Sequence, residues 1–353
     1  MKQDKCYIAY LDFIRYALRN EAAPLNSSVR IDWYDFLQYC NRQGIVGIVF
    51  DGLQRANLKI NQNLLYQWIS YSEMIRQQNY VVNHRVSKIV SFFADKGYRS
   101  CILKGQANGL MYPKPEVRTP GDIDIWVEGR TEEIIKFVLS VAPSAEYSLH
   151  HIKMPVLKDV SVEVHYRPAN LQRRKYDIKL QQYVALLADE QFSHKEMLDG
   201  IEIGTLTDEF NAVYQILHMY GHFFSTRNSF KQFIDYYYLL KKGISPEAKD
   251  DCLRVFKELH LTKYVSGIMW IMKEVLGLED QSLIGEVSEK EGRLILNESL
   301  FYGTCSKVVA RSMYDQTMAN ARILSNYPEE VLISPLYLLW HQWWKLKMKW
   351  KLK

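Results

Sequence analysis

Short strand-like segments in the middle of an otherwise helical sequence restrict the fold of this chain more than any other feature. Residues 122–129 (DIDIWVEG) alternate polar and apolar side chains, and residues 160–166 do so again. Period-two alternation indicates strands with one buried face. On both sides of this middle segment, apolar residues recur three and four positions apart, which is typical of helices. We therefore expect an α+β fold, a small mixed sheet between two helical regions.

The same pattern divides the chain into three parts. Residues 1–95 are predicted to be helical, residues 96–206 to hold the sheet, and residues 207–353 to be helical with a basic, aromatic tail. A helix is expected over 131–142, where two acids open the first turn. Strands are expected near residues 98–103, 122–129, 146–153, 156–157, 160–166 and 201–206.

The net charge of +5 comes from one short segment. The chain has 45 Lys and Arg against 40 Asp and Glu, and five of the lysines lie in residues 345–353, which hold no acid. Without that tail, 40 bases face 40 acids. Proteins that bind long nucleic acids usually carry a basic face or groove. A long nucleic acid is therefore disfavoured as a partner.

Composition and cysteine usage predict a cytoplasmic protein. Hydrophobic residues make up 48% and charged residues 24% of the chain, as in ordinary globular proteins. Charges run through the first twenty residues, so no signal peptide is expected, and no run approaches the ~18 apolar residues of a membrane span. The absence of a CxxC pair and the wide spacing of the cysteines suit a reducing compartment. The cysteines are Cys6, Cys40, Cys101, Cys252 and Cys305.

Carboxylates on two predicted strands point to a metal site. Asp122 and Asp124 flank Ile123, so both side chains are expected on one face of their strand. Oxygen ligands of this kind suit Mg²⁺, although two solvated aspartates at a strand edge would give the same pattern. Glu163 and His165 share a face of the later strand. Pairing of the two strands would complete a carboxylate triad able to hold two metal ions.

A predicted turn upstream would suit a phosphate group. Lys104 and Gly105 end the first strand and open a short helix, a place where backbone N–H groups receive anions. An ordinary turn glycine is the simpler alternative for Gly105. The turn, the aspartate pair and the Glu-x-His strand occur together in this order, which favours a catalytic site over three unrelated features.

The segments LKGQANGLMYP, RTPGDIDIWV and VSVEVHYRP resemble the polymerase-β-type nucleotidyltransferase superfamily. Within it, they are most similar to a group of bacterial proteins catalogued as uncharacterised nucleotidyltransferases. The likeness covers roughly residues 35–245 and implies a polymerase-β-like core. The residues that carry it are Lys104, Gly105, Tyr112, Arg118, Asp122, Asp124, Glu163 and His165, followed by His218, His222 and Asp235.

By this resemblance the chain is an enzyme that moves a nucleoside monophosphate from an NTP, with ATP expected, to a hydroxyl acceptor and releases pyrophosphate. The resemblance implies that Mg²⁺ or Mn²⁺ is bound by the catalytic residues Asp122, Asp124 and Glu163, the last of which also activates the acceptor. It assigns phosphate binding to Lys104, Gly105, Gln106 and Arg118. It assigns supporting positions behind these groups to His165, His218, His222 and Asp235. Gln106 departs from the serine of many superfamily members, and the gap from Gly105 to Asp122 is long.

Two other functions stay open on the sequence. A DxD pair at a strand end also binds metal and a nucleotide-sugar in glycosyltransferases, although Lys104-Gly105 and the Glu-x-His strand count against that. A non-catalytic nucleotide-binding or interaction protein that retains the fold would carry the same motifs. For an enzyme, the acceptor is a protein side chain, a sugar, a small hydroxyl compound or, least favoured by the neutral body, an RNA end.

The tail, residues 336–353, combines aromatic residues with alternating lysines. As a helix its lysines would spread over more than one face, whereas as a strand they would separate cleanly from the apolar residues. Such an end suits weak contact with an anionic membrane surface or with nucleic-acid phosphates. Packing of its tryptophans on the C-terminal helical region is the alternative.

Further histidines and one basic loop are weaker candidates. His150 and His151 straddle the two faces of a predicted strand and are interpreted as incidental. His218 and His222 share a helical face at a spacing that can bind zinc, but packing or hydrogen bonding is favoured. Residues 226–231 include one arginine and one lysine. We expect them either to contact a nucleotide or to be a solvent-exposed helix cap.

Overall fold

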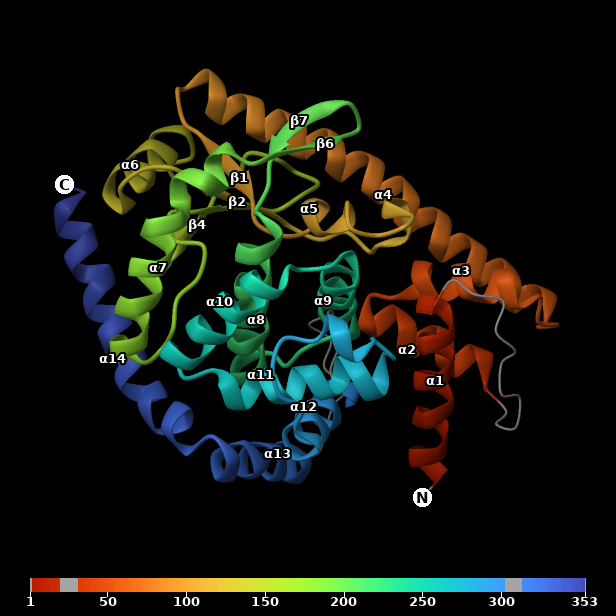
Figure 1. The fold of residues 1–353 in the computed structure, drawn as a ribbon. Coiled ribbons are helices and arrows are strands. Elements are labelled where there is room, and N and C mark those ends of the chain that lie inside the picture. The colour runs from red at the N-terminus through yellow and green to blue at the C-terminus, as the bar shows by residue number, and fades with distance from the viewer. Residues whose placement is uncertain (1, 20–30, 302–312, 353) are drawn as a thin grey trace.

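A computed structural model describes residues 2–19, 31–301 and 313–352 of the chain. In it, a mixed five-stranded sheet lies between helices from both ends of the sequence (Figure 1). The fold therefore belongs to the α+β class that the sequence predicts.

The helices precede, interrupt and follow the sheet. The N-terminal helices are α1 (Lys2–Arg19), α2 (Trp33–Gln43), α3 (Val46–Ala56) and α4 (Gln62–Asp95). The strands are β1 (Ser100–Ile102), β2 (Ile123–Val127), β3 (Glu146–Tyr147), β4 (His151–Lys153), β5 (Val162–His165), β6 (Lys195–Leu198) and β7 (Ile201–Gly204). The helices among them are α5 (Gln106–Gly109), η1 (Pro115–Val117), α6 (Thr131–Val141) and α7 (Arg174–Ser193). The C-terminal helices are α8 (Asp208–Ser225), α9 (Phe230–Lys242), α10 (Pro246–Glu258), α11 (Thr262–Trp270), η2 (Ile271–Val275), η3 (Asp280–Ser282), α12 (Glu289–Phe301), α13 (Met313–Asn326) and α14 (Pro328–Lys351).

The sheet has one polar and one apolar face. Its strand order is β1-β2-β5-β4-β3, with β2 and β5 parallel and the other neighbours antiparallel. The register sets Asp124 opposite Glu163, and His151 opposite His165. Because side chains alternate along a strand, these groups share one face. Ile125 and its apolar neighbours occupy the other face and are buried.

Helices α4 and α6 cover the apolar face. Val86 and Phe93 of α4 and Ile134 of α6 belong to the same buried cluster as the strand residues, and α4 runs along the sheet in Figure 1. The earlier half of α4, with Trp68, belongs instead to the cluster built by the helical regions. One helix thus links both cores, and the proposed boundaries after residues 95 and 206 stay predictions.

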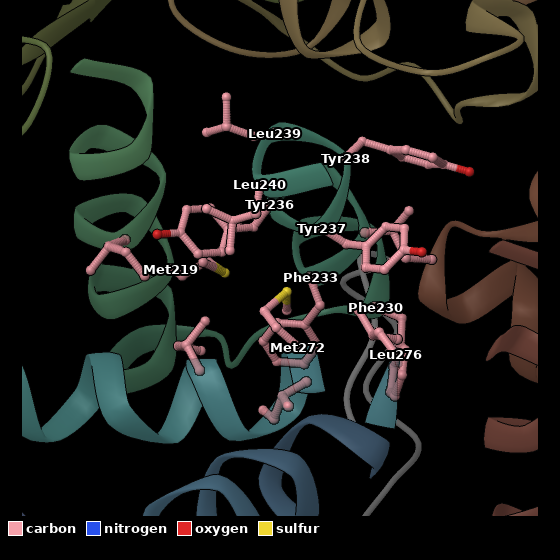
Figure 2. Packing of buried hydrophobic residues seen from close by; sticks show 14 of the residues in the cluster. Met219, Phe230, Phe233, Tyr236, Tyr237, Tyr238, Leu239, Leu240, Met272 and Leu276 are labelled. Carbon is pink, nitrogen blue, oxygen red and sulfur yellow. The ribbon is translucent and has the colours of Figure 1, made fainter. Parts of the chain in front are cut away.

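Helix α9 lies at the centre of the second core. Every side chain from Phe233 to Leu240 is buried, which is typical of a helix surrounded on all sides. Figure 2 shows Tyr236 extending towards α8, whereas Tyr237 and Tyr238 extend away from it. Asp235 therefore lies deep in a largely apolar environment.

Most of the predicted strands are confirmed, with three differences. Residues 146–153 form a hairpin, β3 and β4, in place of one strand, and residues 156–157 are not a strand. Strand β6 was not predicted. It pairs with β7, and the turn between the two strands consists of Asp199 and Gly200, which both have positive φ (49° and 82°). An Asp-Gly pair between strands is a strong hairpin signal, so the sequence did contain this information.

The tail is helical, which is one of the two conformations considered from the sequence. Residues 336–351 belong to α14, which runs past α7 to α6 at the edge of the molecule (Figure 1). Trp344 and Met348 pack on the sheet cluster, and Trp344 contacts Tyr147 of β3. Among the described residues, Trp344 therefore packs on the sheet region and not on the cluster built by the helical regions. Lys353 lies outside the described residues.

The sequence predicts neither a disulfide framework nor a membrane span. Cys40, Cys101 and Cys252 are free and buried, while the side chains of Cys6 and Cys305 lie outside the described part of the chain. Of the helices that the structure describes, none combines the length and apolar content needed to cross a bilayer.

Gly204 is required where β7 passes close to β1. A Cβ added there would lie 2.2 Å from the carbonyl oxygen of Ser100, so the backbone would have to move. We expect Gly204→Ala to lower the free energy of unfolding by about 1–3 kcal/mol. Gly221 in α8 is the matched control because a Cβ there meets nothing within 4 Å. Gly221→Ala should raise stability by about 0.5–1 kcal/mol. Urea unfolding of both variants checks this, and a similar change in both would contradict it.

Candidate active site

Asp124 is the centre of the polar face of the sheet. Its side chain is 1% exposed, and its Oδ1 lies 3.0 Å from Nε2 of His165. Lys104 places Nζ 3.1 Å from Oδ2, although none of the described donors is aligned to hydrogen bond with that oxygen. Burial alone would raise the pKa of Asp124, but the Lys104 ammonium and the His165 ring hold it well below its usual value. Asp124 is therefore a buried, ionised carboxylate.

Lys104 owes its charge to the carboxylates around it. Burial works against the ammonium, yet Asp124 and Asp122 outweigh that effect and raise the pKa of Lys104 above its ordinary value. Because Lys104 lies two residues after the end of β1, its position depends on the pairing of β1 with β2. The site thus holds a cation beside its central carboxylate.

Glu163 stands next to Asp124 in the parallel register, as the predicted pairing of the two strands requires. It is half-buried, with Oε2 3.7 Å from Nε2 of His151 and Oε1 3.8 Å from Nζ of Lys153. Burial and the charge of Asp124 raise the pKa of Glu163. Ligand atoms of Asp124, Glu163 and His165 all lie within 4.8 Å of one another. These three residues are able to surround a metal ion.

Asp122 lies just outside this group because β2 begins at Ile123. Its side chain is half-buried, and its carbonyl oxygen would lie 3.4 Å from a Cβ added to Gly105. Gly105 has φ 66° and ψ −112°, a conformation that favours glycine. The turn after β1 therefore rests against residues 118–122, the loop before β2, which we call the aspartate loop. Helix α5 after the turn has only four residues, so its dipole adds little.

Gln106 directs its amide towards α4. Its Nε2 donates to Oδ1 of Asn79 at 3.2 Å and also to Oδ1 of Asn83. Asn79 in turn donates to the carbonyl oxygens of Arg118 at 2.8 Å and Glu116 at 3.1 Å. Helix α4 therefore fixes both the turn and the start of the aspartate loop, while phosphate binding by Gln106 stays a prediction.

Arg118 is held in a buried ion pair with Asp235 of α9. Its Nε and Nη2 donate to the two carboxylate oxygens, both at 2.7 Å. The hydroxyl of Tyr112 donates to the same carboxylate at 2.6 Å, and Asn108 donates at 3.3 Å. This geometry attaches the aspartate loop to the central helix. Phosphate binding by Arg118 stays a prediction, and it would require this pair to open.

His150 and His151 lie at the site, which corrects their interpretation as incidental. Nδ1 of His151 is 3.0 Å from Nε2 of His150, and the ring of His165 lies within 5.6 Å of both. Burial and the neighbouring His165 lower the pKa of His151 to about 3 and that of His150 well below its usual value. All three rings offer ligand atoms within 4.8 Å. His150 lies in the turn between β3 and β4, which the sequence reading merged into one strand, and the pairing of β4 with β5 sets His151 opposite His165.

His218 and His222 approach the site from α8. Their ring centroids are 4.4 Å apart, and Nδ1 of His222 hydrogen bonds with Oγ1 of Thr226 at 2.7 Å. Burial and the charge of Lys104 lower the pKa of His222 to about 4 and that of His218 well below its usual value. Both rings are therefore neutral at pH 7. The hydrogen bonds described for Asp235 go to other residues, so its predicted grouping with these histidines is not supported.

Lys231, in the basic segment noted in the sequence, lies against the aspartate loop. Its Nζ is 3.5 Å from the carbonyl oxygen of Thr119 and 3.7 Å from a Cβ built on Gly121. Burial, together with the nearby Arg118 charge, lowers the pKa of Lys231 to about 8. Helix α9 thus supplies a second cation beside Asp122.

Comparison with known proteins gives a family match and a similar solved structure. A family model described as "Uncharacterised nucleotidyltransferase" matches residues 30–277, which include every strand and every residue of the site. Among solved structures, an antigenic nucleotidyltransferase-like protein from Paracoccidioides brasiliensis is similar at 13% identity, with 50% of this chain and 87% of that chain covered and a TM-score of 0.31. No curated protein matches the chain. Because the family model spans well over half of the sequence, the chain belongs to the family of uncharacterised nucleotidyltransferases.

Proposed function

We propose that this chain transfers a nucleoside monophosphate from an NTP to a hydroxyl acceptor and releases pyrophosphate. The observation that carries the proposal is the parallel register that sets Asp124 opposite Glu163, with Nζ of Lys104 3.1 Å from Asp124. Membership of the nucleotidyltransferase family supports the class of reaction.

The donor set at the sheet fits a divalent cation. Asp124 and Glu163 offer carboxylate oxygens and His165 offers an imidazole, while Asp122 lies just outside this group in the adjoining loop. Oxygen ligands suit Mg²⁺ and Mn²⁺, and the imidazole shifts the preference towards Mn²⁺. When bound, such an ion would neutralise charge on the triphosphate and orient it for in-line displacement.

The residues of the chain would then accept the acceptor proton and contact the phosphates. The acceptor oxygen forms a bond to the α-phosphorus while the bond from phosphorus to the α,β-bridging oxygen breaks, so that pyrophosphate leaves. Glu163 takes the acceptor proton as the general base. Lys104 moves from Asp124 to a phosphate oxygen. Transfer should rise with pH through the pKa of Glu163.

Lys231 is proposed as a second contact for the phosphates. Lys231→Met should weaken binding of a non-hydrolysable Mn²⁺·NTP analogue by about 10- to 100-fold, the range for a hydrogen bond to a charged group. In the parent chain, binding should also weaken as pH rises through about 8, where Lys231 loses its proton. Titration calorimetry at pH 7 and pH 9 measures both effects.

Lys242, at the other end of α9, supplies the control. Its ammonium is exposed and paired with Asp208, so Lys242→Met should leave nucleotide affinity unchanged. Thermal stability of Lys231→Met should not fall, because burial already disfavours the charge that is removed. Unaltered affinity in Lys231→Met would show that this lysine does not contact the nucleotide.

A pyrophosphate-release screen identifies the nucleotide and the acceptor. Four NTPs, with ATP expected to be preferred, are combined with Mg²⁺ or Mn²⁺ and with sugars, small alcohols and hydroxyl-containing peptides as acceptors. Metal-dependent release with one acceptor class supports the proposal. Consumption of a UDP-sugar in its place would assign the site to glycosyl transfer. Metal-independent NTP binding without any release would assign the chain to nucleotide binding alone.

A further inference from the structure

Helix α14 carries an apolar stripe that faces solvent. After Pro335, five large apolar side chains recur at intervals of three and four residues, and each is between 55% and 80% exposed. This spacing places them on one side of the helix. They are Leu336, Leu339, Trp343, Leu346 and Trp350.

The opposite side of α14 fixes the orientation of the helix. Met348 is 4% exposed and, with Trp344 and Leu352, packs on the sheet cluster. The Lys351 ammonium pairs with Glu132 of α6, and Asn170 donates to the hydroxyl of Tyr337 at 2.8 Å. The helix therefore already has an inner apolar face. The exposed stripe is a second face, on the outside of the molecule.

Lysines flank this outer stripe. At about 100° per residue, Lys347 falls on one side of the stripe and Lys349 on the other, and both are exposed. The helix has no acid after Glu330. An apolar stripe with leucine and tryptophan between rows of lysine is the pattern of helices that lie in a bilayer interface. Tryptophan prefers the headgroup level.

We propose that α14 binds an anionic lipid surface, with its outer stripe in the headgroup boundary and its lysines on the anionic headgroups. Pairing of two copies through the stripe in a parallel arrangement would set lysines against lysines, which disfavours that arrangement. Nucleic-acid phosphates would engage the lysines but leave the leucines exposed. The inference is independent of the reaction proposed for the site.

Vesicle sedimentation of the full chain tests the proposal. Vesicles of phosphatidylcholine with phosphatidylglycerol should bind at least ten times more protein than phosphatidylcholine alone. Lys347→Glu/Lys349→Glu should lower that binding at least ten-fold, because each lysine near an anionic leaflet contributes about five-fold. Trp343→Ser/Trp350→Ser should lower it to a similar extent. Brominated acyl chains should quench the fluorescence of the parent chain and not that of the tryptophan variant.

Matched variants elsewhere on the surface provide the controls. Leu186→Ser removes an apolar side chain as exposed as Trp350, and Lys257→Glu/Lys290→Glu repeats the charge change on exposed lysines of α10 and α12. Both should bind vesicles like the parent chain. Equal binding to neutral vesicles, an equal loss in the controls, or no binding would overturn the proposal. A dimer in sedimentation velocity that the tryptophan variant abolishes, without vesicle binding, would assign the stripe to a second copy.

Discussion

Asp124→Asn is expected to lower nucleotidyl transfer by about 10³-fold or more, the scale on which residues that stabilise phosphoryl-type transition states act. The carboxylate is buried, ionised and central to the metal-capable group. An amide would remove the charge that holds both the cation and Lys104. Pyrophosphate release with the best NTP and acceptor measures the loss. Electron paramagnetic resonance of free Mn²⁺ measures the accompanying loss of metal binding.

Two further variants separate chemistry from folding. Asp124→Asn leaves Lys104 without its counterion, so its unfolding curve has to be recorded beside its activity. Glu163→Gln keeps the Lys104–Asp124 pair and should lose about 10²-fold or more by removing the base. Asp159→Asn, an exposed carboxylate paired with Arg85, should retain full activity. Normal turnover in Asp124→Asn would remove this site from consideration as the catalytic centre.

Asp235→Ala is expected to lower the free energy of unfolding by about 3–5 kcal/mol, because it leaves a buried guanidinium without a partner. Arg118 and Asp235 are both 4% exposed and bonded through two contacts of 2.7 Å. The double variant Arg118→Met/Asp235→Leu should recover much of the loss, since an apolar pair needs no counterion. Urea unfolding of the single and double variants gives the coupling free energy between Arg118 and Asp235. A cost below about 1 kcal/mol for Asp235→Ala would mean that water reaches the pair.

The same pair gives a pH dependence with a defined sign. Burial would raise the pKa of Asp235, but Arg118 outweighs it and holds the pKa below the ordinary value. The unfolded chain therefore binds more protons as pH falls. The stabilisation is present above the ordinary aspartate pKa and is lost as pH falls through the lowered one. The difference between the parent chain and Asp235→Ala should shrink from pH 7 towards pH 3. A constant difference would contradict the assignment.

The parts of the site that could be predicted from the sequence are those that local alternation determines. Period-two patterns located β2 and β5, and with them the faces that carry Asp124 and Glu163. Their pairing was a hypothesis that the structure confirms, and the register shows that the two strands run parallel. The alternation also extended across Asp122, yet the strand begins one residue later. Strand ends depend on neighbouring loops, which periodicity does not describe.

The remaining features depend on contacts between distant segments. Arg118 meets Asp235 across 117 residues, and no local pattern indicates which acid a lone arginine will find. His151 reaches His165 only because β4 and β5 pair in an antiparallel arrangement. In α14, lysines alternating with apolar residues imitate a strand, but the helix buries one apolar face on the sheet and exposes another. The alternation alone therefore did not decide between a helix and a strand for this tail.

The attachment of the aspartate loop to α9 sets an order for assembly of the site during synthesis. The sheet residues leave the ribosome after those of α1 to α4, and β2 and β5 are complete before any of the C-terminal helices exists. The loop that carries Asp122 gains its buried anchor only when residue 235 has been made and α9 has entered its core. Domains generally fold from the N-terminus as they emerge. We infer that the nascent chain holds an unfinished site until the second core closes, because the loop that carries Asp122 is anchored last.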